Sequence, residues 1–155
     1  MKIVLDTSVV LNAVYSSKSS ASTSSRRIFD LLISGELEVF TCDVFLGEIL
    51  RVVSTDPKLS KVKPPYLEAR IDEYLKHTIV VSIEEVNKVR MSPNFQLFKN
   101  GTMNENDMYL IALSIAKKVE YLLTYDKDVK AISVATPLSI VDPAEFLHLE
   151  RKRFS

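Results

Sequence analysis

The sequence predicts an α/β fold of three layers, in which a five-stranded, mostly parallel sheet has helices on both faces. Short apolar runs with the length and branching of buried strands recur along the chain. Segments with apolar residues at helical spacing lie between these runs. Strands that alternate with helices in this way are typical of parallel sheets with right-handed crossover connections.

Five short runs are expected to form the strands, over residues 3–5, 37–41, 78–81, 119–123 and 137–141. The first of them, Ile3-Val4-Leu5, consists only of apolar residues. Such a run is typical of a strand that is buried on both faces. We therefore expect the N-terminal strand to lie inside the sheet.

Helices are expected after each of the first strands. A short helix follows Asp6, and a second covers residues 26–34, where Gly35 provides a left-handed stop. Asp43 is expected to cap a third helix that runs to about residue 53. A fourth starts at the prolines of residues 64–65, since proline is favoured in the first helical turn. Its expected inward-facing residues are Leu67, Ile71, Tyr74 and Leu75.

Polar residues mark the starts of the later helices. Residues 82–85 match a capping box, Asn104 precedes a strongly apolar helix, and residues 142–145 start a last short helix. Two segments are expected to be loops. The serine-rich residues 16–25 form a surface loop, with a lid beside a site as the alternative, and residues 92–101 are rich in turn formers.

Length and composition fit one domain over residues 1–150, followed by a short basic tail over residues 151–155. The chain has 155 residues, of which 46% are hydrophobic, enough for a single sizeable core. Lysine plus arginine and aspartate plus glutamate number 20 each, so the formal net charge is zero. No overall positive field favours nucleic acid, and RNA binding would depend on local patches or metal ions.

Several functional classes are disfavoured by composition. The single Cys42 indicates a reducing compartment, and without a signal peptide or a membrane-length apolar run we expect a cytoplasmic protein. Two separate histidines argue against a zinc site or a Ser-His-Asp triad, and three scattered glycines exclude a phosphate-binding loop. Any metal would be held by oxygen ligands, which suits Mg²⁺ or Mn²⁺.

Two of the expected strands end in a hydroxyl and a carboxylate. Asp6 follows the first strand, and Asp126 follows the fourth strand together with Thr124. In open parallel sheets, ligands bind at the carboxyl ends of the strands. If the first and fourth strands are neighbours, the two carboxylates emerge side by side. The alternative for Asp6 is an N-cap of the next helix.

Glu48 lies on a helix face that is otherwise apolar, within one turn of Val44, Phe45 and Val52. A carboxylate on a face directed at the core is costly unless it is paired or binds a cation. The alternative to a functional role is a salt bridge with Arg51, three residues further on.

Asp107 stands in the first turn of its apolar helix, where the helix dipole stabilises a carboxylate. Capping alone would explain Asn104 and Glu105, but Leu110 and Ile111 direct Asp107 along the buried face. Four carboxylates would then converge, and they would repel one another unless a divalent cation neutralises them. Such a site suits hydrolysis of a phosphodiester by a metal-activated water.

These segments together resemble a PIN domain, and the likeness covers nearly the whole chain. It lies in the order and spacing of residues 3–8, the helix with Glu48, and residues 107–112, 122–128 and 141–147. The chain is similar in particular to single-domain prokaryotic members, many of which are VapC-type toxins of toxin–antitoxin pairs. The resemblance implies the strand order 3-2-1-4-5, Mg²⁺- or Mn²⁺-dependent cleavage of RNA, a homodimer, and an antitoxin protein as partner.

The resemblance also implies which residues form the site. The catalytic, metal-binding acids fall on Asp6, Glu48, Asp107 and Asp126, with Ser8 and Thr124 as supporting hydroxyls. Many relatives carry another acid where this chain has Asn104, so a second metal would bind weakly or only with substrate. Asp128 is close enough to compete with Asp126 as a ligand, and Asp126 is favoured because it directly follows the strand and Thr124.

Two alternatives stay open at this stage. The first is a non-catalytic module that keeps the fold and binds RNA or a partner protein. The second is a phosphatase with Asp6 as covalent nucleophile. Such phosphatases require another aspartate two residues further on as general acid, and this chain has Ser8 there.

Overall fold

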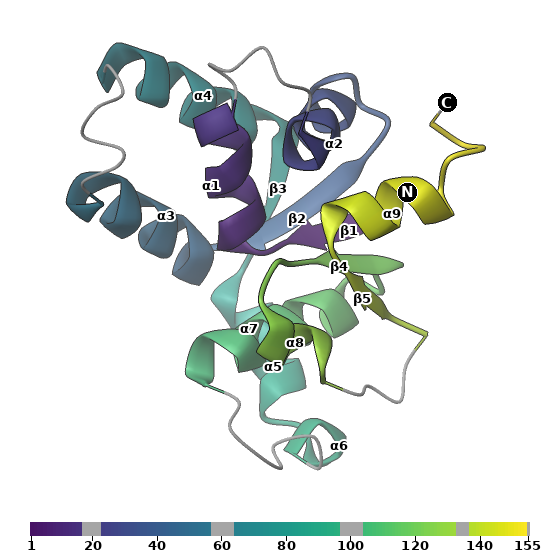
Figure 1. The fold of residues 1–155 in the computed structure, drawn as a ribbon. Helices are drawn as coiled ribbons and strands as arrows, with labels where there is room; N and C mark the ends of the chain where they lie inside the picture. Colours follow the sequence, from purple (N-terminus) through teal and green to yellow (C-terminus); the bar gives the residue numbers. More distant parts are fainter. Residues whose placement is uncertain (17–22, 57–63, 97–103, 133–136, 155) are drawn as a thin grey trace.

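The computed structural model has a parallel five-stranded sheet with helices on both faces (Figure 1). It describes residues 1–16, 23–56, 64–96, 104–132 and 137–154. The strands are β1 (Lys2–Leu5), β2 (Glu38–Cys42), β3 (Thr78–Val81), β4 (Tyr121–Leu123) and β5 (Ser139–Val141). Their order is β3-β2-β1-β4-β5, and every neighbouring pair is parallel. The predicted fold class and strand order are confirmed.

The central strand β1 is buried on both faces. Val4 pairs with Phe40 of β2 on one side and with Leu122 of β4 on the other. Ile3 and Leu5 pack into the core on one face of the sheet, whereas Val4 packs into the core on the opposite face. This alternation explains why the N-terminal strand is apolar at successive positions.

One face of the sheet is covered by α1 (Thr7–Ser16), α2 (Ser24–Ile33), α4 (Pro64–His77) and α9 (Pro143–Leu149) (Figure 1). Large buried side chains such as Phe29, Tyr74 and Phe146 fill the core beneath them. After α9 the chain folds back, and the ring of Phe154 lies 5.9 Å from that of Phe146. In the described parts of the chain, no helix combines the length and hydropathy that a membrane crossing requires.

The opposite face is covered by α5 (Ile83–Arg90) and α7 (Glu105–Ala116), with the short helices α6 (Pro93–Gln96) and α8 (Lys127–Lys130) nearby (Figure 1). The helix α3 (Asp43–Thr55) contributes to both cores, since Phe45 belongs to this one and Ile49 to the other. The middle turn of α3 lies near the carboxyl end of β1, since Glu48 accepts a hydrogen bond from Thr7, two residues after that strand.

Some boundaries differ from the sequence predictions. Cys42, not Asp43, is the N-cap of α3, so Asp43 is a first-turn acid that the helix dipole stabilises. Thr23 caps α2 through its side chain, and the helix therefore starts two residues earlier than expected. Leu75 is 39% exposed because it lies one position around the helix from the buried Tyr74.

The two predicted loops are only partly described. Residues 17–22 of the serine-rich segment lie outside the described residues, whereas its flanks end α1 and begin α2. In the predicted loop 92–101, α6 forms because Phe95 is buried and its N–H is bound by Ser92 Oγ at 3.3 Å. The remaining residues 97–101 lie outside the described part.

Candidate active site

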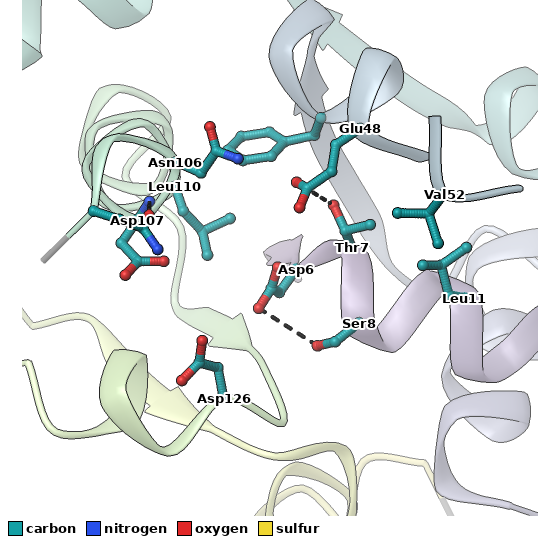
Figure 2. A pocket seen from close by; sticks show the side chains of 12 residues that line it. Asp6, Thr7, Ser8, Leu11, Glu48, Val52, Asn106, Asp107, Leu110 and Asp126 are labelled. Atoms are coloured by element: carbon teal, nitrogen blue, oxygen red, sulfur yellow. Dashed lines mark hydrogen bonds between the residues drawn. The ribbon is translucent and has the colours of Figure 1, made fainter. Parts of the chain in front are cut away.

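A pocket of about 290 Å³ opens at the carboxyl end of β1, between α1, α3 and α7 (Figure 2). Four carboxylates line it: Asp6 from the β1–α1 junction, Glu48 from α3, Asp107 from the first turn of α7, and Asp126 from the turn after β4. The fold thus places all four acids predicted from the sequence around one pocket.

Asp6 and Asp126 are placed by the pairing of β1 with β4. The Asp6 N–H donates to the Leu123 carbonyl at 2.9 Å, which continues the strand pairing into the site. Thr124 is completely buried, and its Oγ1 donates to Asp6 Oδ2 at 2.6 Å while it accepts the Asp126 N–H at 3.0 Å. One hydroxyl therefore fixes the Asp6 carboxylate and the start of the Asp126 turn.

Ser8 makes a second, weaker connection between the same segments. Its Oγ donates to Asp6 Oδ2 at 3.4 Å and accepts the Tyr125 N–H at 3.4 Å. Both distances are near the outer limit of a hydrogen bond. Thr124 therefore orients Asp6 more firmly than Ser8 does.

Glu48 is held by Thr7, a residue that the sequence analysis did not single out. Thr7 is buried, and its Oγ1 donates to Glu48 Oε2 at 3.0 Å (Figure 2). The alternative partner Arg51 forms no ion pair with Glu48, although the structure describes both residues. In the sequence, the position of Thr7 next to Asp6 is the single hint of a role in the site. The contact with Glu48 could not be predicted, because it depends on how α1 packs against α3.

Asn104 and Asp128 are placed differently by the fold. Asn104 lines the pocket and caps α7, with its Oδ1 accepting the Asp107 N–H at 2.9 Å. Asn106, which the sequence analysis did not name, also lines the pocket. Asp128 is exposed outside this lining, and its N–H is bound by Asp126 Oδ1 at 2.8 Å. The geometry therefore favours Asp126 over Asp128 as a pocket acid.

The charges in the pocket disfavour full ionisation. Burial raises the pKa of Asp6 above its ordinary value; the Thr124 hydrogen bond lowers it and the charge of Asp126 raises it further. Burial also raises the pKa of Asp107, and the charges of Asp126, Asp6 and Asp128 add to the effect. A cation among these carboxylates would relieve the repulsion and favour their ionised forms.

The donor set fits a hydrated divalent cation. All four pocket acids offer oxygen atoms, which Mg²⁺ and Mn²⁺ prefer. The acids surround the pocket without meeting at one point, and no three Asp, Glu, His or Cys side chains of the described residues form a ready ligand group. Mg²⁺ commonly uses one or two carboxylates and keeps several waters, so acids spaced around a pocket suit it.

The fold and the site together define an α/β protein with a parallel sheet in the order β3-β2-β1-β4-β5 and a cluster of acids at the carboxyl end of its central strand. The chain belongs to the PIN domain family, whose model matches residues 2–128. No curated protein sequence matches the chain significantly.

Solved structures of low sequence identity share the fold. VapBC2 from Rickettsia felis, bound to a DNA fragment from their promoter, has a TM-score of 0.60 at 17% identity, covering 90% of this chain and 98% of that one. PAE2754 from Pyrobaculum aerophilum has a TM-score of 0.60 at 13% identity, covering 97% of this chain and 90% of that one. VapC20 from Mycobacterium tuberculosis, described as a Sarcin-Ricin loop cleaving toxin, has a TM-score of 0.56 at 16% identity, covering 83% of this chain and 93% of that one.

Proposed function

We propose that this chain is an endoribonuclease that hydrolyses RNA phosphodiester bonds with the help of Mg²⁺ or Mn²⁺. The observation that carries the proposal is the gathering of four carboxylates around one pocket in a chain of the PIN domain family. The raised pKa values of Asp6 and Asp107 support it, because a bound cation would offset the burial and the repulsion between acids that raise them. Such an enzyme would act in the cytoplasm, as the composition led us to expect.

The acids of the pocket would bind the cation, and two threonines would orient the acids. Asp6, Glu48, Asp107 and Asp126 would hold the cation, which when bound neutralises charge on the phosphate and activates a water. Thr124 and Thr7 keep the oxygens of Asp6 and Glu48 directed at the pocket. This reaction needs no covalent nucleophile from the protein.

Replacement of Asp6 tests the proposal. Asp6→Asn keeps the shape of the side chain and should reduce cleavage of single-stranded RNA in Mn²⁺ by more than about 100-fold, beyond the loss typical of a supporting residue. The matched control is Asp128→Asn, a neighbouring acid outside the pocket lining, which should cleave like the wild type. Full activity of a folded, repurified Asp6→Asn protein would refute the assigned site.

We infer further that the chain is the toxin of a toxin–antitoxin pair, which its fold likeness to VapBC2 supports. Its expression alone in bacteria should then arrest growth, and the Asp6→Asn variant should not. Normal growth with active, well-expressed enzyme would contradict the toxin role and leave the nuclease proposal standing. The homodimer that the family resemblance implies stays a prediction, which light scattering can test.

A further inference from the structure

Tyr125 is an exposed aromatic residue whose backbone adjoins the acidic pocket, since its N–H donates to Oγ of the pocket residue Ser8. It lies between Thr124, which holds Asp6, and Asp126, which lines the pocket. The residue is 41% exposed, and among the large exposed hydrophobic residues of the described chain it is the single aromatic one. An exposed aromatic side chain at this place is not needed for the core.

Tyr125 is held through its hydroxyl and through its backbone. The Tyr125 hydroxyl and Ser25 Oγ are 2.6 Å apart, and Ser25 is completely buried in the first turn of α2. The Tyr125 backbone N–H donates to Ser8 Oγ at 3.4 Å. A surface tyrosine usually loses rotamer freedom when it binds a ligand, but the buried serine already restricts this one. The ring is therefore arranged in advance for a contact.

The charge of the molecule favours an uncharged source of RNA affinity. The formal net charge is zero, and four carboxylates line the pocket. The chain as a whole therefore has no net positive field of the kind that attracts phosphates to basic proteins, and affinity has to come from local contacts. Stacking of a base on an aromatic ring needs no net charge and tolerates any base.

We propose that Tyr125 is a stacking surface for the nucleobase next to the phosphodiester bond that reaches the pocket. The proposal rests on the proposed nuclease function and adds a substrate-positioning residue to it. Because every base has a flat aromatic face, the ring would accept any base at that position. Ser25 is then a positioning residue, which acts through the tyrosine hydroxyl.

The test measures binding separately from cleavage. Short single-stranded RNAs that carry one 2-aminopurine, whose fluorescence is quenched when it stacks, are titrated with protein in Ca²⁺ in place of Mg²⁺ or Mn²⁺. Tyr125→Leu should weaken binding about tenfold, in line with the loss of one stacked base, and should abolish the quenching. Tyr125→Phe should retain the quenching, because the ring remains, and should weaken binding less than Tyr125→Leu, because it loses only the bond to Ser25. The matched control Tyr66→Leu, on α4, should bind like the wild type.

The outcomes separate this inference from the function on which it rests. If Tyr125→Leu binds and quenches like the wild type, the stacking role is wrong, even where the wild type cleaves RNA in Mn²⁺. If the wild type never cleaves but quenching depends on the ring of Tyr125, the stacking surface stands and the nuclease proposal fails. Equal losses in Tyr125→Phe and Tyr125→Leu would also overturn the stacking role, because they would assign the effect to the hydroxyl.

Discussion

Thr124 is the residue on which the geometry of the pocket depends most. Its buried hydroxyl donates to Asp6 and accepts from the backbone of Asp126, so it joins acids from two different strands. Loss of this hydroxyl leaves the half-buried Asp6 carboxylate without its shortest hydrogen bond. The orientation of the acids would then rest on the longer contacts of Ser8.

We therefore expect Thr124→Val, which keeps the shape but not the hydroxyl, to lower RNA cleavage by about 10- to 100-fold, as for other residues that orient metal ligands. Its free energy of unfolding should fall by about 1–3 kcal/mol, because the half-buried Asp6 carboxylate and the Asp126 N–H lose a hydrogen-bond partner. Steady-state cleavage assays and urea denaturation measure the two effects. The comparison variant is Ser8→Ala, which should lose less activity and less stability. Equal losses in Ser8→Ala and Thr124→Val would show that Thr124 does not orient Asp6 more firmly than Ser8 does.

The charge of Asp107 is expected to destabilise the metal-free fold. Its folded-state pKa is raised above the ordinary value of 3.8, so the folded state binds this proton more tightly than the unfolded state. Stability therefore falls as the pH rises from 3.8 through the raised pKa, and the loss is complete above it. Asp107→Asn removes the charge and should raise the melting temperature at neutral pH in EDTA.

The matched control for Asp107 lies in the same helical turn. Glu105 is an exposed first-turn acid of α7 outside the pocket lining, so Glu105→Gln loses only the favourable interaction with the helix dipole. It should lower the melting temperature slightly. Below pH 3.8 the difference between Asp107→Asn and the wild type should vanish. A lower melting temperature for Asp107→Asn at neutral pH would show that the dipole outweighs the repulsion.

Among the elements, α7 combines a structural and a functional demand at its first residues. Asn104 caps the helix through its side chain and also lines the pocket. Aspartate caps helices as well as asparagine does, so Asn104→Asp should keep the stability of the helix. The new carboxylate would add an oxygen ligand at the pocket. Half-maximal cleavage should then occur at a lower Mn²⁺ concentration, which a metal titration of the activity measures.

The control for this element separates capping from metal binding. Asn104→Ala removes the cap and should cost about 1 kcal/mol of stability without lowering the Mn²⁺ requirement. If Asn104→Asp and the wild type require the same Mn²⁺ concentration, residue 104 does not contribute to metal binding.

The sequence predicted those parts of the fold and of the site that follow from the apolar pattern of a whole strand or helix. Apolar runs and helical spacing were enough for the five strands, and Asp6 and Asp126 could be found because each follows a buried strand. The α8 helix was not predicted, since four residues are too few for a periodic pattern. The contact of Thr7 with Glu48 was not predictable either, because it joins positions 41 residues apart.

At the scale of the whole molecule, the site exists only because two cores meet at β1. Phe45 of α3 and Leu110 of α7 belong to the core on one face, whereas Ile49 of α3 belongs to the core on the other. This packing brings α3 and α7 to the same edge of the sheet. The folded chain thus holds four acids together, and unfolding would disperse them. A cation that binds the pocket therefore binds the folded state alone.

Mn²⁺ should accordingly stabilise the whole molecule. A ligand present at 100 times its dissociation constant stabilises the folded state by about 2.7 kcal/mol. For a chain of this size that corresponds to a rise in melting temperature of about 5–10 °C. Glu48→Gln should abolish most of the rise, because it removes one carboxylate of the pocket, whereas Asp128→Asn should retain it. Scanning fluorimetry with increasing Mn²⁺ measures the shift, and a wild-type melting temperature that stays constant throughout would contradict the metal site.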